Sequence, residues 1–198
     1  MRSLNEYITL NESSAINERS VNNTKPRSVK VLQKIIKQRI AEQGPNCDLN
    51  DIDVSGMKNM SHLFCGDTKG ADKILNSFNG DISQWDVSNV VDMSCMFWNS
   101  KFNNDISQWD VSRVEDMNHM FMNSKFNKDI SQWNVSKVEN MNCMFAWSVF
   151  NKDISSWDVS NVRNMNYMFS KSKFKGDLSK WNTSKVEQSL HIFNPDLH

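Results

Sequence analysis

The fold is decided by residues 102–125, FNNDISQWDVSRVEDMNHMFMNSK, a stretch whose pattern restarts at Phe126 and then every 24 residues. Large apolar residues keep the same place in each unit. They are Phe78, Phe102, Phe126, Phe150 and Phe174; Trp85, Trp109, Trp133, Trp157 and Trp181; and Phe97, Phe121, Phe145, Phe169 and Phe193. A period between about 20 and 50 residues is typical of proteins in which each repeat stacks on the next. We therefore expect the repeated part to form one elongated domain.

The spacing within one unit predicts a short strand followed by a short helix. Three apolar residues have the L-x-x-L-x-L spacing of a strand with inward side chains: Ile106, Trp109 and Val111. Four more have the i, i+3, i+6 and i+7 spacing of one helix face: Val114, Met117, Met120 and Phe121. A period of 24 lies in the range of leucine-rich repeats, and parallel crossovers are usually right-handed. We predict an α/β fold, a right-handed leucine-rich-repeat-type solenoid of about six strand-helix coils.

The repeated signature also carries a family resemblance. Over roughly residues 48–193 it reads F-x-x-D-I-S-x-W-D-V-S-x-V-x-x-M-x-x-M-F-x-x-S, which resembles the BspA-like leucine-rich repeat family of bacteria and mycoplasmas. The resemblance implies a leucine-rich-repeat-type solenoid and, where roles are known, surface display and partner binding. It implies no catalytic residue. No catalytic triad, paired-carboxylate or phosphate-loop motif stands out either, so we expect no enzymatic activity and no cofactor.

We divide the chain into three parts. Residues 1–24 are polar and are predicted to be a flexible segment or a targeting peptide. Residues 25–47 carry an apolar stripe at helical spacing before Gly44-Pro45, which predicts an N-terminal capping helix. Residues 48–198 make up the repeat solenoid, with an additional loop around residues 66–70. Within the first part, several residues are similar to the head-targeting peptides of large tailed phages: Leu4, Tyr7, Ile8, Glu12, Ile16, Asn17 and Glu18.

Composition narrows the possible partners. Lysine plus arginine number 23 and aspartate plus glutamate number 23, so no positive field favours nucleic-acid binding. The chain contains no run of ~20 apolar residues for a membrane span and no apolar segment for a secretion signal. We expect a monomer that is cytoplasmic as synthesised, with a virion or the cell surface as alternative destinations.

Polar residues on the predicted strand form rows down the stack. Because the tryptophans and valines point inward, the residues between and beside them should point outward. The expected rows are Gln84, Gln108 and Gln132; Asp86, Asp110, Asn134 and Asp158; and Ser88, Ser112 and Ser136. Two interpretations of these rows remain open. They are either a solvated structural surface or a face that binds a partner. Trp98 and Trp147 join the candidate partner-binding residues because they lie off the core pattern, and exposed tryptophans are enriched at binding hot spots.

Cysteine and histidine share one position of the predicted helix, which raises the question of a metal site. The position reads His62, Cys95, His119, Cys143, Tyr167 and His191. Thiolate and imidazole are preferred zinc ligands, but the helical wheel places these side chains on the outer surface. We therefore expect variable surface residues and no bound metal. Cys95 and Cys143 lie two coils apart, about 10 Å at the spacing of strands, so they should not form a disulfide. Pairing of Cys47 with Cys65 stays open.

These observations favour a non-enzymatic protein that binds another macromolecule. The partner would be a protein or a cell-surface or virion macromolecule, bound in protein–protein interaction or adhesion through the repeated strand face. The alternative is a structural virion component of a tailed phage, directed by the N-terminal peptide.

Overall fold

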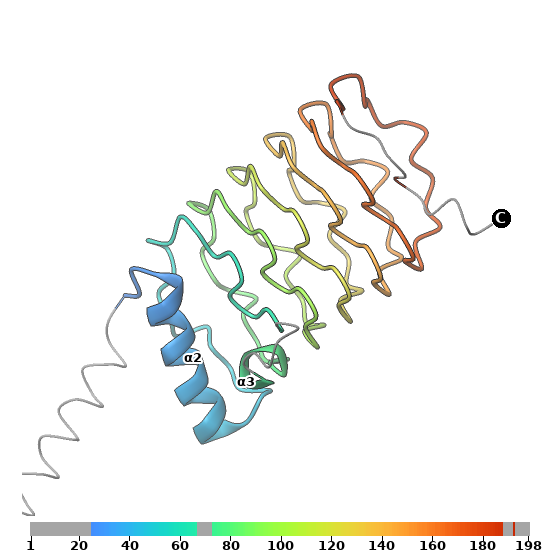
Figure 1. Ribbon diagram of the computed structural model, residues 1–198. Helices are drawn as coiled ribbons and strands as arrows, with labels where there is room; N and C mark the ends of the chain where they lie inside the picture. The colour runs from blue at the N-terminus through green and yellow to red at the C-terminus, as the bar shows by residue number, and fades with distance from the viewer. Residues whose placement is uncertain (1–24, 67–72, 188–191, 193–198) are drawn as a thin grey trace, which may run out of the picture.

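The computed structural model describes residues 25–66, 73–187 and 192. Figure 1 shows a stack of similar loops, one for each repeat unit, that runs from helix α2 to the C-terminal end. The segment predicted as a targeting peptide, residues 1–24, lies outside the described residues. Residues 67–72, which include most of the additional loop, also lie outside the described residues.

The predicted strand-helix coil is wrong. In the described part of the chain there are two helices, α2 (Val29–Gln43) and α3 (Lys73–Asn76), and α3 belongs to the insertion before Phe78. No extended strand forms among these residues either. Neighbouring units are instead joined by single parallel β-bridges: Asn59 to Asp92, Asp92 to Asp116, Asp116 to Asn140 and Asn140 to Asn164. The 24-residue unit is thus built from turns.

Left-handed residues prevent the expected helix. Each complete unit has two residues with positive φ, one within the segment predicted as helical and one two residues after its last apolar residue, and a right-handed helix of L-residues cannot pass through that conformation. The first position has φ between 53° and 58° and is occupied by His62, Cys95, His119, Cys143 and Tyr167. The second has φ between 52° and 59° and is occupied by Asn99, Asn123, Trp147 and Lys171.

The backbone of this segment forms hydrogen bonds in two directions. The Met96 N–H donates to the Met93 carbonyl at 3.2 Å, which closes a tight turn, whereas the Cys95 N–H donates to the Asn118 carbonyl of the next unit at 2.9 Å. The same alternation continues along the segment and recurs in later units. Successive turns and inter-unit bonds therefore satisfy the backbone without a helix or a strand. We call this segment, residues 92–99 and its equivalents, the ladder.

The segment predicted as a strand consists of turns as well. The Trp109 N–H donates to the Ile106 carbonyl at 3.2 Å, and the Val114 N–H donates to the Val111 carbonyl at 2.9 Å. The tryptophans themselves point inward, as predicted, since Trp109 is only 4% exposed. The apolar spacing correctly predicts which side chains are buried, but the backbone that buries them forms turns rather than a strand.

Aromatic rings fill the centre of the stack. Trp85 and Trp109 lie nearly parallel, with ring centroids 6.5 Å apart, and Phe97 and Phe121 stack at 5.5 Å. Each core tryptophan also donates its indole N–H to a carbonyl of the preceding unit at 2.8 to 3.2 Å, and the Trp109 partner is Ile82. The apolar stack therefore also aligns each unit with its neighbour.

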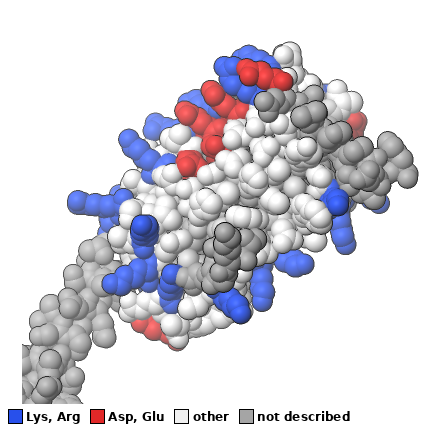
Figure 2. Space-filling view, viewed as in Figure 1, with Lys and Arg blue, Asp and Glu red and all other residues white. Residues whose placement is uncertain are grey.

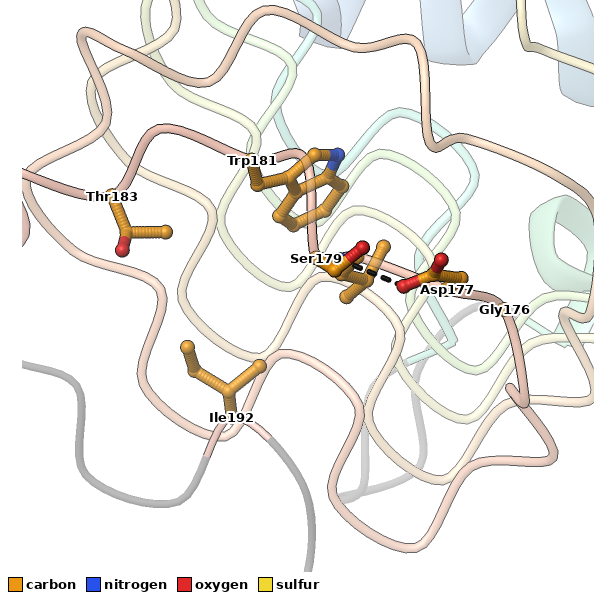
Figure 3. A pocket seen from close by; sticks show the side chains of 7 residues that line it. Gly176, Asp177, Ser179, Trp181, Thr183 and Ile192 are labelled. Carbon is orange, nitrogen blue, oxygen red and sulfur yellow. Dashed lines mark hydrogen bonds between the residues drawn. The ribbon is translucent and has the colours of Figure 1, made fainter.

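The two ends of the stack differ. At the N-terminal end, α2 begins after Ser28, whose side chain accepts a hydrogen bond from the Val31 N–H, and it stops at Gly44 with φ of 87°. Four of its residues are buried: Leu32, Ile35, Ile36 and Ile40. At the C-terminal end, Trp181 borders a cavity of about 370 Å³ together with Thr183 and Ile192, as Figure 3 shows. Thr183 stands where the other units have valine.

We expect Trp109→Ala to reduce the free energy of unfolding by about 3–5 kcal/mol, because it removes a buried ring and the hydrogen bond to Ile82. Trp109→Phe keeps a ring in the stack and should cost less. Urea denaturation followed by circular dichroism measures both. Equal losses for the two variants would show that ring stacking does not hold the units together.

Candidate functional site

The polar rows lie beside and between the buried tryptophan and valine of each unit. The glutamine precedes the tryptophan, the aspartate or asparagine separates the tryptophan from the valine, and the serine follows the valine. The glutamines, aspartates and Asn134 are exposed, and the serines are half-buried. The exposed members are Gln84, Gln108 and Gln132, with Asp86, Asp110, Asn134 and Asp158. The half-buried members are Ser88, Ser112 and Ser136. We call Asp86, Asp110, Asn134 and Asp158 the first acidic row.

Each member of the first acidic row also has a local structural role. The Ser112 N–H donates to Asp110 Oδ1 at 3.0 Å, and the Ser136 N–H donates to Asn134 Oδ1 at 3.2 Å. The equivalent bonds join Ser88 to Asp86 and Ser160 to Asp158. A side-chain oxygen two residues before the donor is the usual arrangement of an Asx turn. Aspartate and asparagine both serve in this role.

Two of the aspartates have a pKa lower than that of a free carboxyl group. Hydrogen bonds from the Ser112 hydroxyl and backbone N–H lower the pKa of Asp110, and the equivalent bonds from Ser160 lower the pKa of Asp158. Two carboxylates ~5 Å apart repel by about 3 kcal/mol at an effective dielectric constant of ~20, and by less than 1 kcal/mol in water. Asn134 separates Asp110 from Asp158 and so limits this repulsion.

A second acidic row was missed by the sequence analysis. It is unbroken and exposed, and it consists of Asp81, Asp105, Asp129, Asp153 and Asp177. Each carboxylate accepts the N–H of the serine two residues later at 2.9 Å. In the last unit, this is the bond between Ser179 and Asp177 drawn in Figure 3. The Asp-Ile-Ser tripeptide that recurs in the repeat signature was the signal that could have found it.

Trp98 and Trp147 lie in the ladder rather than in the turns that carry the acidic rows. The Trp98 ring is half-buried, with its centroid 6.4 Å from that of His119. Trp147 is 54% exposed, and the Nζ of Lys171 lies 4.6 Å from its ring centroid. The predicted site residues therefore occupy two different segments of the unit.

The cysteine and histidine positions do not form a metal site among the described residues. Their left-handed backbone, rather than a helix, sets where they point, and Cys95 is buried instead of lying on the surface. Burial raises the pKa of the Cys95 thiol to about 12, and burial lowers the pKa of His119. A protonated thiol is a poor ligand and a poor nucleophile. No disulfide joins Cys47 to Cys65, and His191 lies outside the described residues.

None of the helices in the described part of the chain has the length and hydropathy of a membrane span.

Comparison with known proteins identifies one family. A family model described as "Mycoplasma protein of unknown function, DUF285" matches residues 9–147 and, in a second match, residues 100–196. The two matches overlap, which is what a repeated sequence produces. No curated protein and no solved structure matches the chain.

Substitution of Asp110 tests the role of the Asx turn. We expect Asp110→Ala to lower the free energy of unfolding by roughly 0.5–1.5 kcal/mol, because the Ser112 N–H loses its acceptor. Asp110→Asn should change it by no more than a few tenths of a kcal/mol, because Asn134 makes the same bond in the next unit. Thermal melts of the two variants compare them, and equal losses would contradict the capping role.

Acid should destabilise the fold through the same carboxylates. A group whose pKa is lower in the folded state contributes stability above its unfolded pKa of ~3.9, and this is lost as the pH falls through the folded value. We therefore expect the melting temperature to fall below about pH 4. The double variant Asp110→Asn with Asp158→Asn should lose less between pH 5 and pH 3 than the wild type. If the melting temperatures of the two proteins followed the same curve with pH, the acid sensitivity could not be assigned to Asp110 and Asp158.

Proposed function

We propose that this chain, which belongs to the family of mycoplasma proteins of unknown function DUF285, is a non-enzymatic protein that binds another macromolecule through its acidic rows. The observation that carries the proposal is the regular repetition of exposed carboxylates on turns, each hydrogen-bonded to a backbone N–H group. Because each carboxylate is held by its own serine, a partner would meet a prearranged surface and little side-chain entropy would be lost on binding.

The charge of this surface indicates the chemistry of the partner. Rows of carboxylates at every unit favour a partner with a complementary series of lysine or arginine side chains, and such contacts accelerate association and weaken with salt. The resemblance of the repeat signature to BspA-like proteins supports the same proposal, since surface display and partner binding are the roles known in that family. The proposed surface is made of turns and replaces the strand face expected from the sequence.

A charge-only variant tests the proposal. Asp86, Asp110 and Asp158 are changed together to Asn, which keeps the Asx turns as Asn134 does. The matched control changes three other exposed acids to Gln, namely Glu115, Glu139 and Glu187, and alters the net charge equally. Quantitative affinity capture with the full chain should show at least a tenfold loss of the partner for the Asp variant and no such loss for the control. Equal capture by both variants would reject the first acidic row as the binding surface.

A further inference from the structure

Two bulky aromatic residues occupy an unusual place on the ladder. Among the described residues, four large apolar side chains are exposed, and two of them, Trp147 at 54% and Tyr167 at 42%, lie in adjacent units of the ladder. Both have a left-handed backbone, with φ of 59° and 55°. The other two, Val31 and Ile74, belong to α2 and α3.

Asparagine would suit the backbone of this position better than Trp147 does. The equivalent residues of the two preceding units are Asn99 and Asn123, and asparagine tolerates positive φ far better than a bulky residue does. Trp147 nevertheless keeps 54% of its surface exposed, whereas the core tryptophans keep 3–9%. Residues held in unfavourable backbone conformations cluster at sites of function.

The structure holds the Trp147 ring ready for a ligand. Its backbone N–H donates to the Ser170 carbonyl of the next unit at 2.8 Å, so the base of the side chain is part of the ladder. Lys171, at the equivalent position one unit later, places its Nζ 4.6 Å from the ring centroid, within the range of a cation–π contact. A ring fixed at its base and restrained by a cation loses little freedom when a ligand stacks on it.

Apart from Lys171 and Lys173, the segments around the two aromatic residues are polar and uncharged. Residues 140–149 and 164–170 include no lysine, arginine, aspartate or glutamate. They supply amide and hydroxyl groups instead: Asn140, Asn142, Asn164 and Ser170 are half-buried and reach the surface. Charge on the stack as a whole is uneven, since the face drawn in Figure 2 has most of its charged side chains along its edges.

We propose that Trp147 and Tyr167 form a platform that binds a neutral carbohydrate chain. The C–H face of a pyranose ring stacks on an exposed aromatic ring, where the negative π face attracts the C–H groups, while the sugar hydroxyls bond to amides and hydroxyls beside it. The platform is separate from the acidic rows and does not rest on the function proposed for them.

Other classes of ligand fit this surface less well. An extended peptide that adds to a sheet edge needs unpaired backbone groups, but the Cys143 and Trp147 N–H groups already donate to Asn166 and Ser170. A folded protein partner would need a broad apolar core at its interface, and Trp147 and Tyr167 are the only large apolar side chains exposed on the described part of the ladder. An anionic ligand would meet Lys171 at the Trp147 ring and Lys173 beside Ser148, so the test also includes an anionic polysaccharide.

Calorimetric titration of the full chain tests the proposal. The probes are four soluble neutral hexasaccharides: β-1,4-glucose, α-1,4-glucose, β-1,4-mannose and β-1,4-N-acetylglucosamine. We expect at least one to bind, and Trp147→Asn to weaken its binding at least tenfold. The melting temperature of Trp147→Asn should fall by less than that of Trp109→Ala, because asparagine suits the backbone at Asn99 and Asn123 and the Trp147 ring is only partly buried. As a matched control, Val31→Asn removes another exposed apolar side chain and should leave binding unchanged.

Several outcomes would overturn the platform. No binding of any of the four hexasaccharides would do so, as would unchanged binding to Trp147→Asn. A melting temperature lowered as much as in Trp109→Ala would make Trp147 a packing residue. Binding of polygalacturonate alone, lost in Lys171→Met, would indicate recognition of an anion instead. Failure of the platform can be told from failure of the acidic rows, because the triple Asp→Asn variant leaves Trp147 intact.

Discussion

The rest of the structure depends on the contact between aromatic rings of neighbouring units. Phe97 and Phe121 stack face to face, and each core tryptophan both packs against the stack and donates its indole N–H to the preceding unit. Burial supplies the free energy, and the directed hydrogen bond supplies the register. A unit that was shifted by one residue would lose both. Because this constraint acts on the buried rings, surface residues can be substituted without disturbing the stack. The two candidate binding surfaces consist of such surface residues.

Turns can build such a stack because every backbone group still finds a partner. N–H groups of the ladder alternate between a carbonyl of the same turn and a carbonyl of the next unit. Elsewhere in the unit, aspartate and asparagine side chains replace backbone acceptors, as Asn79 does when its Oδ1 accepts the Asn103 N–H at 2.8 Å. This use of Asx side chains explains why the repeat is rich in Asp, Asn and Ser, and it means that one carboxylate can shape its turn and face a partner.

The two surfaces differ in how they relate to stability. On the acidic rows, the side chain that a partner would meet also supports the fold, as Asp110 does for Ser112. On the ladder, Trp147 replaces a residue better suited to its backbone and contributes an exposed ring. More than half of the surface of Trp147 is exposed, in contrast to the buried core tryptophans. The substitution of tryptophan for asparagine at one repeat therefore points to a local role at that unit.

The sequence by itself determined the period, the side chains that enter the core and the outward direction of Gln84, Asp86 and their equivalents, because burial follows the apolar spacing whatever backbone produces it. Only the tertiary structure decided the backbone conformation. Apolar residues three apart fit one helix face and also a series of tight turns, and residues such as His119 and Trp147 give no local signal for positive φ. Contacts with the neighbouring unit stabilise that conformation. The cation–π contact between Trp147 and Lys171 also depends on the stacking of neighbouring units. The two residues are 24 apart in the sequence, so only the tertiary structure shows this contact.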